Sequence, residues 1–507
     1  MIRIIDCGSQ LTQNIARRVR ELGVFTEIMP FHISSDKVKS DDLEGIIISG
    51  GQFSVYDENS PLPSPDLLTM GVPVLGICYG QQSIAHILGG CVNPTADREY
   101  GQTRVRILRE SLLFKRIQAT ELDVWMSHGD IVEKMPEGFE IVAESEHHIA
   151  SMQDTSRKLF ALQFHPEVDH TDHGRMILNN FIDICSAIRN WDPKLDYQRI
   201  LDETQAKING KTGIGGISGG VDSTAVSILI SKIPETNYHP IFVNNGLLRL
   251  REEDEVQASL KPFGLDVIYA DASQRFLEKL TGISDPDQKR KIIGHEFIEV
   301  FQEEAKKIEN ASYLVQGTLY PDVIESVPIY GSSSKIKRHH NVGGLPEKLG
   351  LDLVEPFRKY FKDEIRKIAD EELGMPKEIV WRHPFPGPGL AVRIMGEVTN
   401  EKLGILRQAD AIYIDELKKL EIYYDISQAF AGLTSSRAVG VMGDEGTYQA
   451  EVRLRAVVTN DFMTSDIYRF GWDQLQKITN LIINRVKGVN RVFYDTTQKP
   501  PGTIEWE

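Results

Sequence analysis

Short apolar runs alternate with helical patterns along the first third of the chain. Residues 2–5, 45–49 and 72–77 are strand-like, and residues 12–22 have the spacing of an amphipathic helix. Alternation of this kind predicts a parallel sheet in an α/β domain. From about residue 123 the pattern changes to shorter strand-like pieces.

The end of this first unit is marked by a change of pattern. The strand-like pieces end at residues 159–165, and a helix over 174–189 is predicted to follow. Pro193, in the sequence Trp-Asp-Pro, then marks a boundary, because proline interrupts a helix and restarts the chain.

The middle third repeats the alternation. The pattern predicts a helix over 197–207, a strand that enters a glycine-rich loop over 214–220, a helix over 223–232 and a strand over 240–243. This is a second βαβ unit of the nucleotide-binding type. A helix over 362–373 is its last predicted element.

A segment rich in proline and glycine precedes the last unit. The sequence HPFPGPGL, at 383–390, excludes a helix or a central strand and predicts a rigid linker. Helices over 399–420 and 473–486 and strands over 452–458 and 491–494 are expected beyond it.

The predicted fold class is therefore α/β. We expect two parallel-sheet α/β domains, at residues 1–190 and 191–381, and a small C-terminal α+β domain at 382–507.

Composition excludes several classes of protein. The 507 residues carry a net charge of −16, which argues against binding to the phosphate backbone of nucleic acid. No apolar run approaches the roughly 20 residues that cross a membrane, and no signal-peptide pattern precedes the first strand. The four cysteines include no C-x-x-C pair, so neither a disulfide framework nor a zinc ribbon is indicated. We expect a cytoplasmic protein.

One of these cysteines has the setting of a nucleophile. Cys78 ends an apolar strand in the sequence Gly-Ile-Cys-Tyr-Gly, which is typical of a nucleophile elbow with cysteine in place of serine. The N-terminus of the following helix favours the thiolate. Cys7, Cys91 and Cys185 lack this setting and are predicted to be structural.

A base and its orienting group occur together further along the chain. The sequence Phe-His-Pro-Glu places His165 and Glu167 at the end of a strand-like run, where His165 is predicted to move the proton and Glu167 to hold its tautomer. The backbone amides of Gly51 and Tyr79 are candidates for an oxyanion hole. Ser-Gly-Gly, Gly-Ile-Cys-Tyr-Gly-Gln-Gln and Phe-His-Pro-Glu, in this order, resemble the class I glutamine amidotransferases. The resemblance implies that Cys78 forms a glutamyl thioester and releases ammonia. Gln52 stands where that family often has proline.

A second site follows a strand in the middle third. Backbone amides and hydroxyl groups at the start of a helix suit a pyrophosphate. Neither a Walker loop nor a dinucleotide-binding fingerprint fits, because Gln205 and Ser218 stand where those motifs need glycine. The loop consists of Ser218, Gly219, Gly220, Val221, Asp222, Ser223 and Thr224.

The sequence of this loop, Ser-Gly-Gly-Val-Asp-Ser, resembles that of the N-type ATP pyrophosphatases, which adenylate an oxygen of their substrate. The resemblance implies that the loop binds ATP and that Asp222 helps to bind Mg²⁺. Lys362 matches the second phosphate-side lysine of that family, although a solvated helix face is an equally good interpretation.

Long strings in the last two-thirds bear on the acceptor of the ammonia. Five of them, at 288–294, 316–326, 339–346, 382–390 and 499–507, together resemble the glutamine-hydrolysing GMP synthetase family over essentially the whole chain. The resemblance implies that XMP is adenylated by ATP, that ammonia displaces AMP to give GMP, and that the C-terminal domain forms a homodimer. The XMP-binding residues it implies are Arg290, Gln428, Asp444, Arg491, Lys499, Ile504 and Glu505. Gly446 departs from the pattern, because the family usually has arginine there.

Other interpretations stay open at this point. A basic loop around His339 and His340 is predicted to be a lid over the pyrophosphate, with a merely solvated loop as the alternative. An amidotransferase that makes NAD or another amide, and a non-enzymatic nucleotide or glutamine sensor, are rival functions. A tRNA-thiolating enzyme is disfavoured, because it needs a second reactive cysteine after the loop and all four cysteines precede Ser218.

Overall fold

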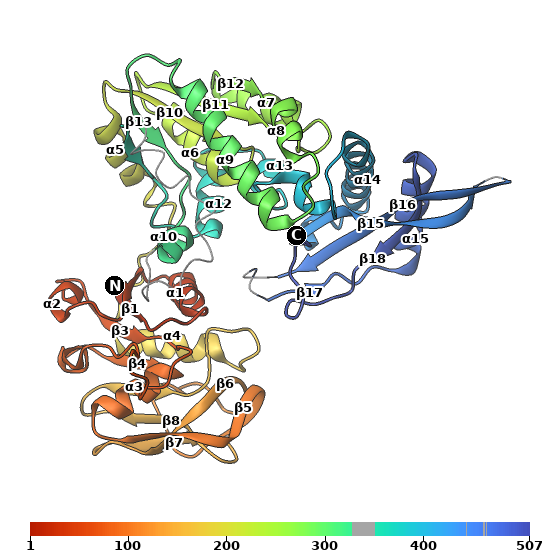
Figure 1. Cartoon of the computed structure of the whole chain (residues 1–507). Helices are drawn as coiled ribbons and strands as arrows, with labels where there is room; N and C mark the ends of the chain where they lie inside the picture. The colour runs from red at the N-terminus through yellow and green to blue at the C-terminus, as the bar shows by residue number, and fades with distance from the viewer. Residues whose placement is uncertain (327–349, 443, 460–461, 463) are drawn as a thin grey trace. The chain divides into compact units, whose positions relative to one another are not determined.

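The chain is organised as two compact units. The computed structural model describes residues 1–326, 350–442, 444–459, 462 and 464–507. The first unit consists mainly of Met1–Asp192, and the second begins at Pro193 (Figure 1). The predicted lid with His339 and His340 lies outside the described residues.

The first unit is built on a nine-stranded mixed sheet. Its strand order is β2-β1-β3-β4-β9-β8-β7-β5-β6, and the first five of these strands are parallel. These five are β2 (Thr26–Pro30), β1 (Ile2–Asp6), β3 (Gly45–Ile48), β4 (Val74–Ile77) and β9 (Leu159–Leu162). The antiparallel remainder is β8 (Ile149–Asp154), β7 (Glu140–Glu144), β5 (Cys91–Ile107) and β6 (Glu121–Lys134). The helices are α1 (Thr12–Glu21), α2 (Ser35–Val38), η1 (Pro65–Thr69), α3 (Tyr79–Ile87) and α4 (Gly174–Ile184).

Two expectations for this unit were wrong. Strand β6, which begins at Glu121, is 14 residues long and not a short piece, whereas β7, β8 and β9 have the short lengths expected. The 17-residue strand β5 was not predicted. Much of β5 is exposed on both faces, so it lacks the apolar alternation that identifies a strand. The helix expected to reach residue 189 ends at Ile184, and Ser186 has a φ of 52°, which a helix cannot continue through.

The second unit contains a five-stranded sheet in the order β12-β11-β10-β13-β14, with every pair parallel. Its strands are β10 (Thr212–Ile217), β11 (Asn237–Asn244), β12 (Ile268–Asp271), β13 (Ala311–Val315) and β14 (Asp352–Val354). The associated helices are α5 (Tyr197–Ile208), α6 (Val221–Ser231), α7 (Glu252–Leu260), η2 (Lys261–Phe263), α8 (Ser273–Leu280), α9 (Pro286–Ala305), α10 (Tyr320–Ser326), α12 (Lys362–Glu371) and α13 (Lys377–Val380).

A smaller sheet of four strands follows in the same unit. Strands β15 (Gln428–Met442) and β16 (Glu445–Val458) form a long antiparallel hairpin, visible as the blue ribbons of Figure 1. β17 (Asp466–Ile467) and β18 (Val489–Tyr494) both pair with β16, and β18 runs parallel to it. The helices of this part are η3 (Gly389–Arg393), α14 (Asn400–Lys419), η4 (Tyr423–Asp425) and α15 (Trp472–Arg485).

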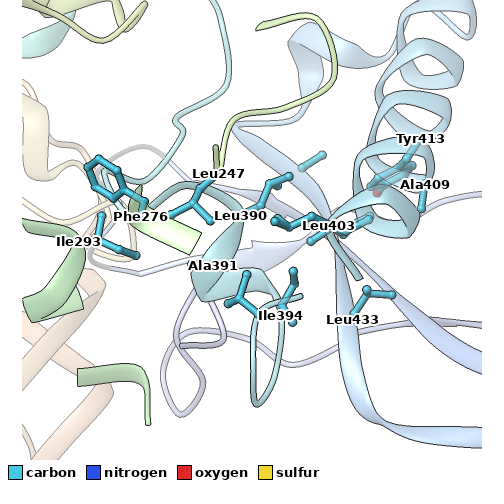
Figure 2. Packing of buried hydrophobic residues seen from close by; sticks show 14 of the residues in the cluster. Leu247, Phe276, Ile293, Leu390, Ala391, Ile394, Leu403, Ala409, Tyr413 and Leu433 are labelled. Carbon is cyan, nitrogen blue, oxygen red and sulfur yellow. The ribbon is translucent and has the colours of Figure 1, made fainter. Parts of the chain in front are cut away.

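One hydrophobic cluster joins the two sheets of the second unit. Leu247 and Ile293, from the five-stranded part, belong to the same buried cluster as Leu390 of η3, Tyr413 of α14 and Leu433 of β15 (Figure 2). The predicted linker therefore leads directly into η3, which packs inside this shared core. It does not separate two independent cores.

The predicted fold class is confirmed: two α/β parts with parallel strands are followed by an α+β part. No helix in the described part of the chain is long and apolar enough to span a bilayer. The limits of the three domains stay predictions.

Candidate active site

Cys78 lies on a strained turn between β4 and α3. Its φ of 55° and ψ of −108° are unusual for a residue with a side chain, and its amide donates to the Leu162 carbonyl at 2.7 Å. A Cβ added to Gly80 would lie 2.3 Å from the Ile48 carbonyl oxygen, and one added to Gly76 would lie 2.6 Å from the Gly80 carbonyl carbon. Both glycines are therefore needed for the turn, which places the sulfur at the N-terminus of α3.

His165 and Glu167 form a buried pair. Nδ1 of His165 lies 2.8 Å from Oε1 of Glu167, and the two residues are 3% and 1% exposed. Burial lowers the pKa of His165, but the charge of Glu167 and the interaction with Cys78 outweigh it and hold this pKa well above its ordinary value. Thr171 fixes the backbone by donating from Oγ1 to the His165 carbonyl at 2.6 Å. The Nδ1 atom of His165 therefore contacts Glu167, and the imidazole lies next to the sulfur of Cys78.

The candidate oxyanion hole also forms beside Cys78. A Cβ added to Gly51 would lie 3.3 Å from Cγ of Tyr79, so the two residues are neighbours. Neither amide donates to another backbone group in the described part of the chain. Both N–H groups are thus available for a developing negative charge. Gln52 is exposed in a bend, so its departure from the usual proline does not touch the sulfur.

The remaining cysteines differ from Cys78 in their surroundings. Complete burial raises the pKa of Cys7 well above its ordinary value, and burial also raises that of Cys185. A raised pKa keeps the thiol protonated and therefore unreactive. Cys91 is half-buried at the start of β5.

The phosphate loop connects β10 to α6. Ser223 Oγ accepts from the amide of Ser218 at 3.2 Å and hydrogen bonds with the Ser218 hydroxyl at 3.1 Å, which closes the loop on itself. Gly219 has a φ of 75°, and a Cβ there would lie 2.4 Å from Val256. The Gly317 backbone packs against Asp222 at the start of α6, since a Cβ on Gly317 would lie 3.0 Å from the Asp222 carbonyl carbon. Two sequence strings predicted to be functional thus meet at one helix N-terminus.

Asp222 and Lys362 are brought together across 140 residues. Nζ of Lys362 lies 3.0 Å from Oδ2 of Asp222, so this lysine is not directed only into solvent. The other carboxylate oxygen of Asp222 is buried and has no hydrogen-bond partner. An unpaired carboxylate oxygen beside a phosphate loop is the hard ligand that Mg²⁺ prefers, so the residues present fit this ion.

Five of the predicted XMP-binding residues lie in or against the segment 495–507, which we call the tail: Lys499, Ile504 and Glu505 belong to it, and Arg290 and Gln428 contact it. Gln428 donates from Nε2 to Oε1 of Glu505 at 2.7 Å, and Arg290 donates to the main-chain oxygen of Glu507. Ile504 is buried next to Phe430 and Val457. These contacts bring α9, β15 and the tail to one place.

Comparisons with known proteins bear on the whole chain. The family model of the class-I glutamine amidotransferases matches residues 3–185, and that of the GMP synthase C-terminal domain matches residues 415–506. The glutamine-hydrolysing GMP synthase of Aquifex aeolicus is 51% identical to this chain, over 100% of this chain and 99% of the relative. That of Carboxydothermus hydrogenoformans is 50% identical, over 99% of both chains. That of Clostridium botulinum is 48% identical over 100% of this chain and 99% of its own.

The chain belongs to the glutamine-hydrolysing GMP synthase family. The names of these relatives describe a synthase that hydrolyses glutamine, and residues 3–185 match the class-I glutamine amidotransferases, so the predicted enzyme class is confirmed.

Two residues that the resemblance to GMP synthases implied lie elsewhere. Asp444 is exposed in the turn of the β15–β16 hairpin, whereas Gln428 begins β15. At about 3.3 Å per residue, the 14 steps of β15 separate these ends by on the order of 40 Å. Arg491 lies on β18 and donates to the Val439 carbonyl at 3.3 Å, part-way along the hairpin. A Cβ on Gly446 would meet nothing within 4 Å, so the arginine of other family members would have room there. Within one subunit, neither Asp444 nor Arg491 joins the tail.

Sequence reasoning missed groups that touch the predicted site residues. Cys78 Sγ donates to the Ser127 carbonyl at 3.7 Å, and Gln82 donates to the Asp130 carbonyl at 2.8 Å. His128, which follows Ser127, is buried, and its Nε2 lies 2.9 Å from the Glu99 carboxylate. The polar string Ser-His-Gly-Asp at 127–130, inside a strand, was the signal that could have revealed this strand as part of the site.

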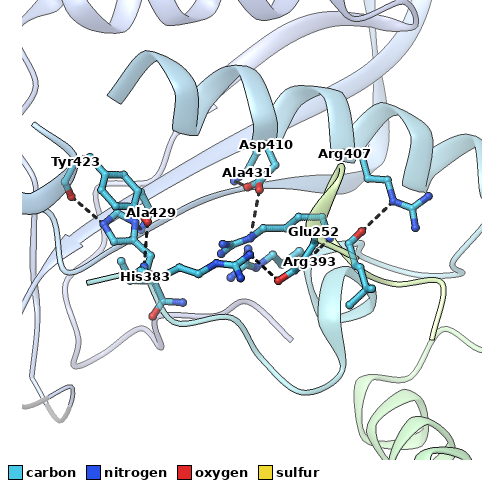
Figure 3. A network of polar contacts seen from close by, with 12 residues as sticks. Glu252, His383, Arg393, Arg407, Asp410, Tyr423, Ala429 and Ala431 are labelled. Carbon is cyan, nitrogen blue, oxygen red and sulfur yellow. Dashed lines mark hydrogen bonds and ion pairs between the residues drawn. The ribbon is translucent and has the colours of Figure 1, made fainter. Parts of the chain in front are cut away.

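A buried polar network in the second unit was also missed. Arg382 donates to the Gly219 carbonyl at 3.4 Å and to the Glu252 carboxylate at 2.7 Å. Oε2 of Glu252, the first residue of α7, accepts a hydrogen bond from the backbone amide of Arg249 at 2.8 Å. Figure 3 shows Asp410 pointing from α14 toward this network, where it lies 3.6 Å from the Arg249 guanidinium. The phosphate loop is therefore held in part by Arg382, the residue that immediately precedes the predicted linker.

Proposed function

We propose that this chain makes GMP from XMP, with glutamine as the nitrogen donor and ATP as the activating substrate. The observation that carries the proposal is the buried His165–Glu167 pair beside the strained Cys78 turn. It supplies a nucleophile, a base and an orienting carboxylate in one place. The full-length similarity to glutamine-hydrolysing GMP synthases supports the choice of acceptor.

The first half-reaction takes place at Cys78. The thiolate attacks the side-chain carbonyl carbon of glutamine, and the amides of Gly51 and Tyr79 stabilise the resulting oxyanion. His165 gives its proton to the departing nitrogen, the C–N bond breaks, and ammonia leaves a glutamyl thioester. Water, deprotonated by His165, then hydrolyses the thioester to glutamate. Glu167 keeps the imidazole oriented throughout.

The second half-reaction requires the phosphate loop. The oxygen at C2 of XMP attacks the α-phosphorus of ATP, and pyrophosphate leaves. The loop amides at the start of α6 bind the phosphates, and Lys362 adds positive charge next to them. Mg²⁺, held by Asp222, would neutralise phosphate charge when bound. Ammonia then forms the new C–N bond at C2, and AMP leaves.

We further propose the domain limits 1–190, 191–381 and 382–507 and a homodimer formed by the last of these. Apolar side chains exposed on the β15–β16 hairpin support the homodimer. Val439 and Tyr448 lie opposite each other in the hairpin and are 71% and 64% exposed, and Val441 is 76% exposed. Apolar side chains grouped in this way favour a protein interface. Sedimentation of the protein with Val441→Glu and Tyr448→Glu tests this, since only an interface on this hairpin predicts dissociation.

Product analysis tests the proposed reaction. With XMP, ATP and glutamine, we expect GMP, AMP and pyrophosphate to form in equal amounts. Cys78→Ala should abolish the reaction with glutamine and leave the reaction with ammonium salts intact. Pyrophosphate release that depends on deamido-NAD in place of XMP would favour the rival amidotransferase, and binding of nucleotides without turnover would favour a sensor.

A further inference from the structure

Three cationic side chains in the second unit are completely buried. Lys289 of α9, Arg393 of η3 and Arg455 of β16 each have 0% exposure. A buried charge costs several kcal/mol unless it is paired and hydrogen-bonded, so such residues are rare without a purpose. Each of the three finds charged or carbonyl partners in the tail, although the three come from elements far apart in sequence.

Arg455 holds the first part of the tail. Its guanidinium donates to the carbonyls of Thr497 and Thr503, the latter at 3.2 Å, and forms an ion pair with Asp495 at 3.4 Å. Trp506 also donates to Asp495, at 2.9 Å. Arg455 therefore connects the beginning of the tail, at Asp495, to Thr503, and Trp506 adds a second contact to Asp495.

Arg393 fixes the carboxylate of Glu505. Nε and Nη2 donate to its two oxygens at 3.1 and 2.8 Å, which is the bidentate geometry that only arginine provides. The guanidinium carbon lies 4.2 Å from the centre of the Phe430 ring, so the fork is also held from its face. Gln428 donates to the same carboxylate. The orientation of Glu505 is thus determined before any ligand binds.

Lys289 holds the last residue of the tail. Its Nζ donates to the Ile394 carbonyl at 2.7 Å and the Ala391 carbonyl at 3.2 Å, and it forms an ion pair with the Glu507 carboxylate. Arg290, the next residue, contacts the Glu507 main chain. The position of Arg290 relative to the tail therefore depends on Lys289.

We propose that Lys289, Arg393 and Arg455 are positioning residues that hold the tail in the geometry required to bind the XMP acceptor. The inference rests on the proposed function, and it assigns the three residues a role in acceptor binding that acts through the backbone of the tail, Glu505 and Arg290. The physical advantage is preorganisation. Ordering a free segment costs conformational entropy at every residue, and a tail that is already ordered avoids this cost when the acceptor binds.

Steady-state kinetics with ammonium as the nitrogen donor test the inference. At saturating ATP, we expect Arg393→Lys to raise the KM for XMP about tenfold or more, because lysine offers a point charge in place of a fork. The kcat and the KM for ATP should stay within about threefold of the wild-type values. Loss of folded protein alone would lower kcat and leave the KM for XMP unchanged. A KM for XMP within twofold of wild type would overturn the inference.

A second variant covers the case in which a single buried charge prevents folding. Lys289→Met with Glu507→Gln removes both members of the ion pair, so no unpaired charge stays buried. We expect this protein to fold and to show a raised KM for XMP, and an unchanged KM would contradict the role of Lys289.

Arg407→Lys is a matched control. Arg407 is a partly buried arginine that donates to the carbonyls of Leu248 and Gly246 and not to the tail. Its KM for XMP should equal that of the wild type. Failure of the wild-type protein to form AMP from XMP and ATP would instead reject the proposed function, and the inference with it.

Discussion

Nδ1 of His165 lies 2.8 Å from Oε1 of Glu167, and a single residue separates the two in the sequence. Residues two apart along an extended chain point to the same side, so the side chains of His165 and Glu167 can meet across Pro166, where the chain begins to turn. The contact leaves the other imidazole nitrogen to face the sulfur of Cys78. It thereby selects one tautomer of the base.

Loss of this contact should impair glutamine hydrolysis alone. In Glu167→Gln the amide still reaches His165 but no longer stabilises the imidazolium, so we expect kcat with glutamine to fall by about 10²–10⁴. GMP synthesis from ammonium should stay within about twofold, because the phosphate loop and tail are untouched. Comparing the two nitrogen donors in one preparation measures both. Equal losses with glutamine and ammonium would contradict the assigned role.

The glycine after the nucleophile should tolerate no side chain. A Cβ on Gly80 would lie 2.3 Å from the Ile48 carbonyl oxygen, a contact that only backbone movement relieves. Because Gly80 lies two residues after Cys78, in the turn that positions the sulfur, we expect Gly80→Ala to destabilise the first unit by about 2 kcal/mol or more and to abolish glutamine hydrolysis. Gly404, in the helix α14, has nothing within 4 Å of an added Cβ and provides the control. Gly404→Ala should be neutral or stabilising by up to about 1 kcal/mol. Thermal unfolding of the two variants gives the comparison.

His383 should make the stability of the second unit depend on pH. Its Nδ1 accepts from the Ala429 amide at 3.1 Å and its Nε2 lies 2.9 Å from the Tyr423 carbonyl, so both nitrogens are used by the neutral ring (Figure 3). Burial lowers its pKa to about 4, below the ordinary value of 6.5. The unfolded chain therefore binds the proton more readily. The stabilisation is complete above pH 6.5 and is lost as the pH falls toward 4.

Between pH 7.5 and pH 5 this loss amounts to about 2 kcal/mol. Many carboxylates also titrate in acid, so the wild type must be compared with His383→Gln, which keeps a donor and an acceptor but does not titrate. We expect the difference in free energy of unfolding between the two proteins to shrink by about 2 kcal/mol over this range. Denaturant unfolding at both pH values measures it, and a difference independent of pH would show that folding does not lower the pKa of His383.

The candidate sites could be predicted because their residues stand in short sequence motifs. The pairing of strands that are distant in the sequence could not be predicted in this way. Cys78 and the loop around Asp222 each stand in a short string whose residue types and glycines point to one reaction. Strand β5 lacked any such signal, because a ribbon exposed on both faces carries no apolar period. The same holds for the outer half of β15. Strand β5 and the outer half of β15 are identified in the structure only by their pairing with neighbouring strands.

The buried cations were invisible for a related reason. Arg393 and Glu505 are separated by 112 residues, and Lys289 and Glu507 by 218. A lone arginine or lysine in a sequence is usually a solvated residue, and nothing in its neighbours reveals a partner so distant. The predicted tail residues lie close together in the structure and their role in binding XMP stays a prediction, whereas the side chains that hold the tail were not foreseen.

Arg382 should control the affinity for ATP through the phosphate loop. Its guanidinium spans the Gly219 carbonyl, at 3.4 Å, and the Glu252 carboxylate, at 2.7 Å. Glu252 is almost fully buried, so its position is fixed and it locates the arginine. Lysine has one charged nitrogen and cannot make both contacts in the same geometry. We expect Arg382→Lys to raise the KM for ATP about tenfold with ammonium as nitrogen donor, and to leave glutamine hydrolysis at Cys78 unchanged.

Two further variants decide whether this effect runs through the loop. Glu252→Gln keeps the size of the side chain but removes the charge that locates Arg382, so it should raise the KM for ATP in the same direction by a smaller factor. Combined with Arg382→Lys it should add little, because both changes release one contact. Arg275→Lys alters an arginine of the α8 surface that pairs with Glu303 and serves as the control. A KM for ATP that is additive in the double variant would mean that Arg382 and Glu252 act separately, and the phosphate loop would then be positioned by its own hydrogen bonds alone.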